Sequence, residues 1–203
     1  VLAGTIKRVL AFALVISALC VAAYPLLKRL AATAIDAGEP VHVFALGDKL
    51  YRPVDVPHTL VPGPRREGTT LTERTLDGIE RLATALAHRI DEFDVLHAQD
   101  CIAARAALRA RDRTGADVTV IRTAHHVDDF TTEALIECQR RSVLDPDHLL
   151  VVSRYWRDRL ASEFGVDSTV VTNGVDAPRF RAPHARDQGL RSQLAAGDRT
   201  VYL

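Results

Sequence analysis

The sequence has no methionine, no net charge and three widely spaced cysteines, and these shortages exclude several classes of protein. Cys20, Cys101 and Cys138 form neither a disulfide framework nor a CxxC pair for a metal or for redox chemistry. We therefore expect a cytoplasmic protein from a reducing compartment. The 26 basic and 26 acidic side chains cancel, whereas a non-specific nucleic-acid binder carries excess positive charge. We accordingly expect no nucleic-acid partner.

Several catalytic motifs are also absent. The chain has no GxSxG elbow of a serine hydrolase and no GxGxxG or GxxxxGK[ST] phosphate-binding loop. Suitable metal-ligating atoms occur in His97, Asp100, His125, His126 and Asp128, but no HxxxH or HExxH spacing groups them on a helix. We expect no metal site.

Residues 9–27 are almost entirely apolar and lie between two basic pairs. Three interpretations are open: a buried strand over about 8–16 followed by a helix over about 25–37, a membrane helix, or a secretory signal. The basic flanks are equal, so they indicate no membrane orientation. We favour the buried strand because the pattern downstream needs a first strand, and membrane contact through Val9–Leu27 stays open as the alternative.

Short β-branched runs then alternate with helical patterns. A capping box at Thr70–Glu73 opens a helix whose apolar face is predicted to contain Leu76, Ile79, Leu82, Leu86 and Ile90. Further helices are expected over 102–111, 133–143 and 155–164, and strands over 41–46, 59–61, 94–98, 118–123, 149–152 and 169–171.

The alternation predicts an α/β fold, a Rossmann-like three-layer domain with a mostly parallel sheet. We expect this domain to cover residues 1–190, with 1–33 atypical and apolar. Residues 191–203 are expected to be a linker and the first strand of a truncated C-terminal domain.

Polar residues follow four of the predicted strands directly. Because carboxyl ends of parallel strands meet at one edge of the sheet, where such folds bind ligands, these residues are candidates for one site. They are His97, Gln99 and Asp100; His125, His126 and Asp128; Ser153; and Asn173 and Gly174.

The segments that carry these residues resemble a known family. HAQDCIAA at 97–104, RTAHHVDDFTTEALIEC at 122–138 and TNGVDAPRF at 172–180 occur in the order typical of family 4 glycosyltransferases, and in particular of an actinobacterial subgroup. The resemblance covers about residues 34–203. It implies the N-terminal, acceptor-side half of a retaining enzyme with two Rossmann-like domains (GT-B).

The resemblance implies transfer of a sugar from a nucleotide-sugar donor to a glycan or small-molecule acceptor, without a cofactor or an obligatory metal. It assigns His125 and Asp128 to catalysis. It also assigns acceptor binding to His97, Asp100 and His126, and it puts Ser153, Asn173 and Gly174 along the cleft and linker.

Two departures from the family pattern stand out. No glycine lies between Gly4 and Gly38, where the family has a glycine-rich loop after its first strand. The family's nucleotide-binding half is also missing, so we expect this chain alone to be inactive. The alternatives are an inactive truncated or membrane-tethered glycan-binding fragment, and a sugar-nucleotide epimerase-like protein.

Overall fold

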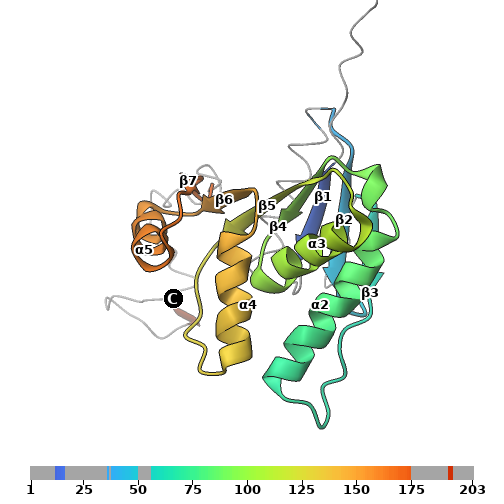
Figure 1. The fold of residues 1–203 in the computed structure, drawn as a ribbon, viewed down its shortest axis with the longest axis horizontal. Helices are drawn as coiled ribbons and strands as arrows, with labels where there is room; N and C mark the ends of the chain where they lie inside the picture. Colours follow the sequence, from blue (N-terminus) through green and yellow to red (C-terminus); the bar gives the residue numbers. More distant parts are fainter. Residues whose placement is uncertain (1–11, 17–35, 37, 50–55, 175–191, 194–203) are drawn as a thin grey trace, which may run out of the picture. The chain divides into compact units, whose positions relative to one another are not determined.

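The described residues contain one parallel sheet (Figure 1). The computed structural model describes residues 12–16, 36, 38–49, 56–174 and 192–193. It divides the chain into two compact units, 1–172 and 173–203, and the sheet belongs to the first. The predicted linker and strand at 191–203 lie outside the described residues apart from 192–193, and remain a prediction.

The sheet has seven strands in the order β3-β2-β1-β4-β5-β6-β7, and every neighbouring pair is parallel. Strand order runs one way from β1 to β3 and the other way from β4 to β7, so the topological switch point lies between β1 and β4. The strands are β1 (Phe12–Ile16), β2 (Val41–Leu46), β3 (His58–Val61), β4 (Val95–Ala98), β5 (Thr119–Ala124), β6 (His148–Val151) and β7 (Thr169–Val170).

The helices are α2 (Leu71–Ala87), α3 (Cys101–Thr114), α4 (Glu133–Leu144) and α5 (Arg154–Phe164), with a 3₁₀ turn η1 at Ile90–Glu92. Helices α2, α3 and α4 lie next to one another over the sheet (Figure 1). The predicted Rossmann-like α/β fold is confirmed.

Local sequence explains where the helices begin and end. The capping box of α2 is present: the Thr70 backbone N–H donates to Glu73 at 2.7 Å, and the Glu73 N–H donates to the Thr70 hydroxyl at 3.2 Å. Helices α3 and α5 end at Gly115 and Gly165, whose φ angles of +69° and +68° favour glycine.

The structure tests part of what we expected for the apolar N-terminal segment. Residues 12–16 form β1, which pairs with β2 on one side and β4 on the other. The interpretation of 9–27 as a membrane helix is therefore wrong for these five residues. Among the helices that the structure describes, none is long and apolar enough to cross a membrane. The helix expected over 25–37 lies outside the described residues, apart from Asp36, which is helical.

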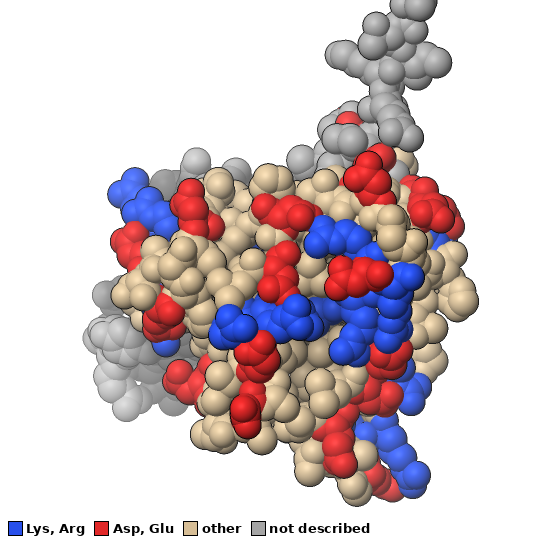
Figure 2. Space-filling view, in the orientation of Figure 1, with Lys and Arg blue, Asp and Glu red and all other residues tan. Residues whose placement is uncertain are grey.

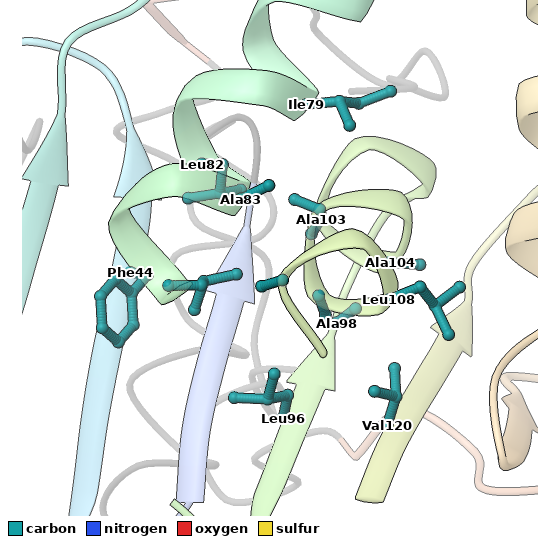
Figure 3. Close-up of a cluster of buried hydrophobic side chains, with 14 of the residues drawn as sticks. Phe44, Ile79, Leu82, Ala83, Leu96, Ala98, Ala103, Ala104, Leu108 and Val120 are labelled. Atoms are coloured by element: carbon teal, nitrogen blue, oxygen red, sulfur yellow. The ribbon is translucent and has the colours of Figure 1, made fainter. Parts of the chain in front are cut away.

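The core lies between the sheet and the helices α2 and α3 (Figure 3). Leu82 of α2 and Leu96 of β4 are completely buried, and the alanines at 103, 104, 106, 107 and 110 let α3 approach closely. One predicted face residue is wrong. Leu76 is 42% exposed, whereas the other four positions are buried: Ile79, Leu82 and Leu86 on α2, and Ile90 in η1, because α2 ends at Ala87.

The outer face of α2, α3 and α4 carries interspersed acidic and basic side chains (Figure 2). Arg105 pairs with Asp145 at 3.1 Å, and Arg113 pairs with Glu80 at 2.7 Å. The hydrogen bond from Arg113 lowers the pKa of Glu80 to about 2, despite a slight opposing effect of burial. These ion pairs join α3 to α2 on one side and to the end of α4 on the other.

Two leucines of α2 provide a matched test of the core. Leu82→Ala should lower the free energy of unfolding by about 2–5 kcal/mol, because it opens a cavity under a fully buried side chain. Leu76→Ala should change it by less than about 1 kcal/mol, because Leu76 is partly in water already. Urea denaturation measures both values, and equal losses would contradict this description of α2.

Candidate functional site

The parallel register of β4 and β5 brings two groups of polar residues together at the carboxyl edge of the sheet. Ala98, the last residue of β4, lies opposite Arg122 of β5. Gln99 and Asp100 therefore leave β4 beside the end of β5, where His125 follows Ala124. We call His97, Gln99, Asp100, His125 and Asp128 the rim cluster. It adjoins the switch point between β1 and β4.

His125 is half-buried and contacts Gln99 across the two strands. Its Nε2 lies 3.2 Å from Gln99 Oε1, so with this amide orientation the Nε2 carries the proton and Nδ1 is left as an acceptor. Burial, and then the charges of His126 and Arg122, lower the pKa of His125. The imidazole is consequently neutral at pH 7, suited to exchanging hydrogen bonds with hydroxyl groups.

His97 lies within β4 rather than after it. Its Nε2 is 2.8 Å from the hydroxyl of Thr123 on β5. Burial, with a smaller contribution from the nearby His125, lowers the pKa of His97 to about 4. His97 is therefore a neutral side chain, and its hydrogen bond to Thr123 links β4 to β5.

Two predicted site residues, Asp100 and Ser153, cap helices. The Asp100 carboxylate accepts the backbone N–H of Ala103 at 2.8 Å and starts α3. The Ser153 hydroxyl accepts the N–H of Trp156 at 3.3 Å and starts α5. Both side chains are thus held at the carboxyl edge by the first turn of the next helix.

Asp128 lies in the loop between β5 and α4, and Gln139 of α4 holds it in place. The Asp128 N–H donates to Gln139 Oε1 and the Gln139 amide donates to the Asp128 carbonyl, both at 2.8 Å. The Asp128 carboxylate remains 51% exposed, and its nearest basic neighbour is the exposed His126, with 3.6 Å between His126 Nε2 and Asp128 Oδ1. The loop backbone is fixed while the carboxylate is open to a ligand.

Arg122 is a guanidinium buried in the sheet below the rim cluster, only 3% exposed. Its Nη1 donates to the Ser142 hydroxyl, which in turn donates to the Gln139 carbonyl at 2.7 Å. Arg122 lies close enough to Asp100 and Asp128 for their charges to oppose the lowering of its pKa by burial. In the described part of the chain, Arg122 Nε and Gln99 Nε2 are buried donors without a hydrogen-bond partner.

Asn173 and Gly174, the last two predicted site residues, are exposed and belong to the second unit. Among the described residues, no three His, Cys, Asp or Glu side chains are grouped as metal ligands. A shallow hollow of about 450 Å³ runs along α2 near Val61 and His88, and none of its lining residues belongs to the rim cluster.

Sequence reasoning assigned no role to Arg122, Thr123 or Gln139, and it placed Gln99 at the edge without naming its partner. A signal was present for two of them. Arg122 interrupts an apolar strand, and Gln139 shares the helical spacing of the buried Leu135, Ser142 and Val143. Polar groups in such positions are normally paired, which marks them as parts of a network.

The chain belongs to glycosyltransferase family 4. The model of that family, described as Glycosyltransferase Family 4, matches residues 26–179. This range contains the whole rim cluster and confirms the family indicated by the sequence motifs. No curated protein matches the chain significantly.

Solved glycosyltransferase structures share the fold at low identity. Anabaena HepE in complex with UDP-glucose aligns with a TM-score of 0.69 at 14% identity, over 93% of this chain and 50% of its own. The galactosyltransferase WaaB of the lipopolysaccharide outer core, in its apo form, aligns at 0.62 and 16%, over 81% of this chain and 46% of its own. A putative UDP-N-acetylglucosamine 2-epimerase from Listeria monocytogenes aligns at 0.61 and 14%, over 91% and 51%. The chain therefore spans about half the length of these GT-B proteins.

The low pKa of His97 predicts that acid destabilises the fold. The folded value of about 4 lies below the unfolded value of about 6.5, so the unfolded chain takes up the proton first as the pH falls. Stability is lost from about pH 6.5 down to about pH 4. Between pH 7 and 5, wild type should lose about 2 kcal/mol more than His97→Gln in urea denaturation. His88→Gln, at an exposed position, should keep the wild-type loss; an unchanged pH dependence in His97→Gln would contradict the assignment.

Proposed function

We propose that this chain supplies the acceptor-side domain of a retaining glycosyltransferase that uses a nucleotide-sugar donor. The observation that carries the proposal is the rim cluster at the switch point of a family 4 fold, where two strand ends present a neutral imidazole and two carboxylates. Because the chain spans about half of the related structures, the proposed activity is that of a protein with both halves.

In this proposal, the rim cluster binds sugar hydroxyl groups. The neutral His125, oriented by Gln99, exchanges hydrogen bonds or a proton with a hydroxyl of the transferred sugar or acceptor. The exposed carboxylate of Asp128 accepts hydroxyl protons on a loop that Gln139 keeps in position. His97, His126 and Asp100 form the surrounding acceptor wall, with Ser153, Asn173 and Gly174 toward the partner half.

The donor is proposed to be a nucleotide sugar held mainly by the other half. Support comes from the HepE structures, which contain UDP, UDP with glucose, or UDP-glucose. No obligatory metal is proposed, and the chain by itself is expected to be inactive because the leaving diphosphate needs preorganised positive charge from that half. Membrane contact through Val9–Leu27 is not part of the proposal, because residues 12–16 form β1.

His125→Ala in the full-length protein should lower kcat/KM for sugar transfer by about 100-fold or more, because the substitution removes the imidazole that exchanges a hydrogen bond or a proton with a sugar hydroxyl in this proposal. His148→Ala is the matched control. His148 is an exposed histidine at the first residue of β6, on the opposite edge of the sheet, and its loss should leave the rate unchanged. A rate equal to that of the wild type in His125→Ala would contradict the catalytic role proposed for this residue.

The stereochemistry of the product tests the retaining assignment. The product's anomeric proton coupling in NMR should match that of the donor, and the rate should be the same with and without EDTA. An inverted product, or loss of activity in EDTA, would refute the corresponding part of the proposal. Formation of an epimerised nucleotide sugar without any acceptor would favour the epimerase-like alternative.

A further inference from the structure

The side chains of Gln99 and His125 meet across the carboxyl ends of β4 and β5, and the contact involves only one nitrogen of the ring. His125 Nε2 lies 3.2 Å from Gln99 Oε1. Among the described residues, this is the only hydrogen bond that either side chain makes. The parallel register, in which Ala98 lies opposite Arg122, brings the two residues together. The ring of His125 is therefore held at Nε2 by the Gln99 amide.

The second ring nitrogen of His125, Nδ1, faces a different environment. It has no hydrogen-bond partner among the described residues, and it is not one of their buried polar atoms that lack a partner. His125 as a whole is half-buried, so Nδ1 is the ring nitrogen that reaches water. A ligand at the rim cluster would therefore meet the ring at Nδ1.

The Gln99 contact decides where the single proton of the neutral ring lies. A carbonyl oxygen can only accept a hydrogen bond, so Gln99 Oε1 requires the proton on Nε2 and leaves a lone pair on Nδ1. The hydrogen bond at one ring nitrogen sets the protonation of the other. In Ser-His-Asp enzymes, an orienting side chain that favours the wrong tautomer costs about 10⁴-fold in kcat. The orienting group can thus control what the ring does.

The charged and titratable groups around His125 keep its ring neutral. Burial, followed by the charges of His126 and Arg122, lowers the pKa of His125, and Asp100 opposes them with a smaller effect. The charge of His125 in turn contributes to the low pKa of His97. The orienting group is an uncharged amide. Unlike a carboxylate, it sets the tautomer without favouring the imidazolium.

We propose that Gln99 is a positioning residue that fixes the Nε2–H tautomer of His125, so that Nδ1 accepts a hydrogen bond from a ligand hydroxyl group. This inference rests on the proposed function, in which the rim cluster binds sugar hydroxyl groups. It narrows that function, because the ligand group that faces His125 must be a hydrogen-bond donor. A free hydroxyl fits this requirement, and an ether or ester oxygen at the same place does not.

The tautomer of His125 can be measured in the 203-residue chain without any activity assay. Long-range ¹H–¹⁵N correlation spectra of the chain with ¹⁵N-labelled histidine distinguish the two tautomers at pH 7, and His125→Ala assigns the signals. The wild type should show Nε2–H alone. In Gln99→Met, which has a side chain of similar length but no oxygen, an Nδ1–H population should appear. An Nδ1–H ring in the wild type, or Nε2–H alone in Gln99→Met, would overturn the proposal.

Gln99→Glu provides a second test through pH. The variant keeps an oxygen that accepts from Nε2 but adds a negative charge, so the pKa of His125 should rise by about 1–3. In the full-length protein, the acid limb of the pH profile of kcat/KM should move to higher pH with it. The signals of His148, on the opposite edge of the sheet, are the internal control and should be identical in wild type and variant. An acid limb that stays in place would contradict the role of the Nδ1 lone pair in sugar transfer.

The two measurements separate this inference from the proposed function. Absence of sugar transfer by the wild-type full-length protein would refute the proposed function. The spectra of the wild type and of Gln99→Met decide the role of Gln99 in either case, because the tautomer is read from the ring itself.

Discussion

The candidate site depends on the parallel pairing of β4 with β5. In this register, His97 lies opposite Ile121 and Ala98 lies opposite Arg122, so both chains leave the sheet at the same edge. The hydrogen bonds from His97 to Thr123 and between His125 and Gln99 follow from that alignment. A shift of one residue would turn every side chain of β4 to the other face and separate these partners.

Burial gives the site its electrostatic character. Burial lowers the pKa values of His97 and His125 and keeps both rings neutral, whereas the more deeply buried Arg122 lies near the carboxylates of Asp100 and Asp128. Buried charge is tolerated only where opposite charges and hydrogen bonds compensate for lost hydration. The result is a rim with two neutral rings near one buried positive charge.

Helices α3 and α4 support the two sides of this rim. The first turn of α3 holds Asp100 through the Ala103 N–H, and Gln139 of α4 holds the Asp128 backbone. The polar edge of this glycosyltransferase family 4 fold is therefore held by the helices that follow β4 and β5.

Much of the secondary structure was readable from local patterns. The capping box at Thr70–Glu73 and the alternation of β-branched runs with helices depend on neighbours within a few residues, and the structure confirms them. The order of the polar strand ends also indicated the shared edge. Leu76 shows the limit: its spacing fits a buried face, but the width of that face depends on what packs against it.

The partners within the site were decided by tertiary structure alone. The contacts of His125 with Gln99 and of Asp128 with Gln139 join residues 26 and 11 positions apart. Short-range propensities carry no information about such pairs, because the pairing is set by strand order, register and helix packing. The chain's own pattern of polar and apolar residues therefore defined the fold and the polar carboxyl edge of its sheet, while long-range packing determined which side chains meet there and with what charge.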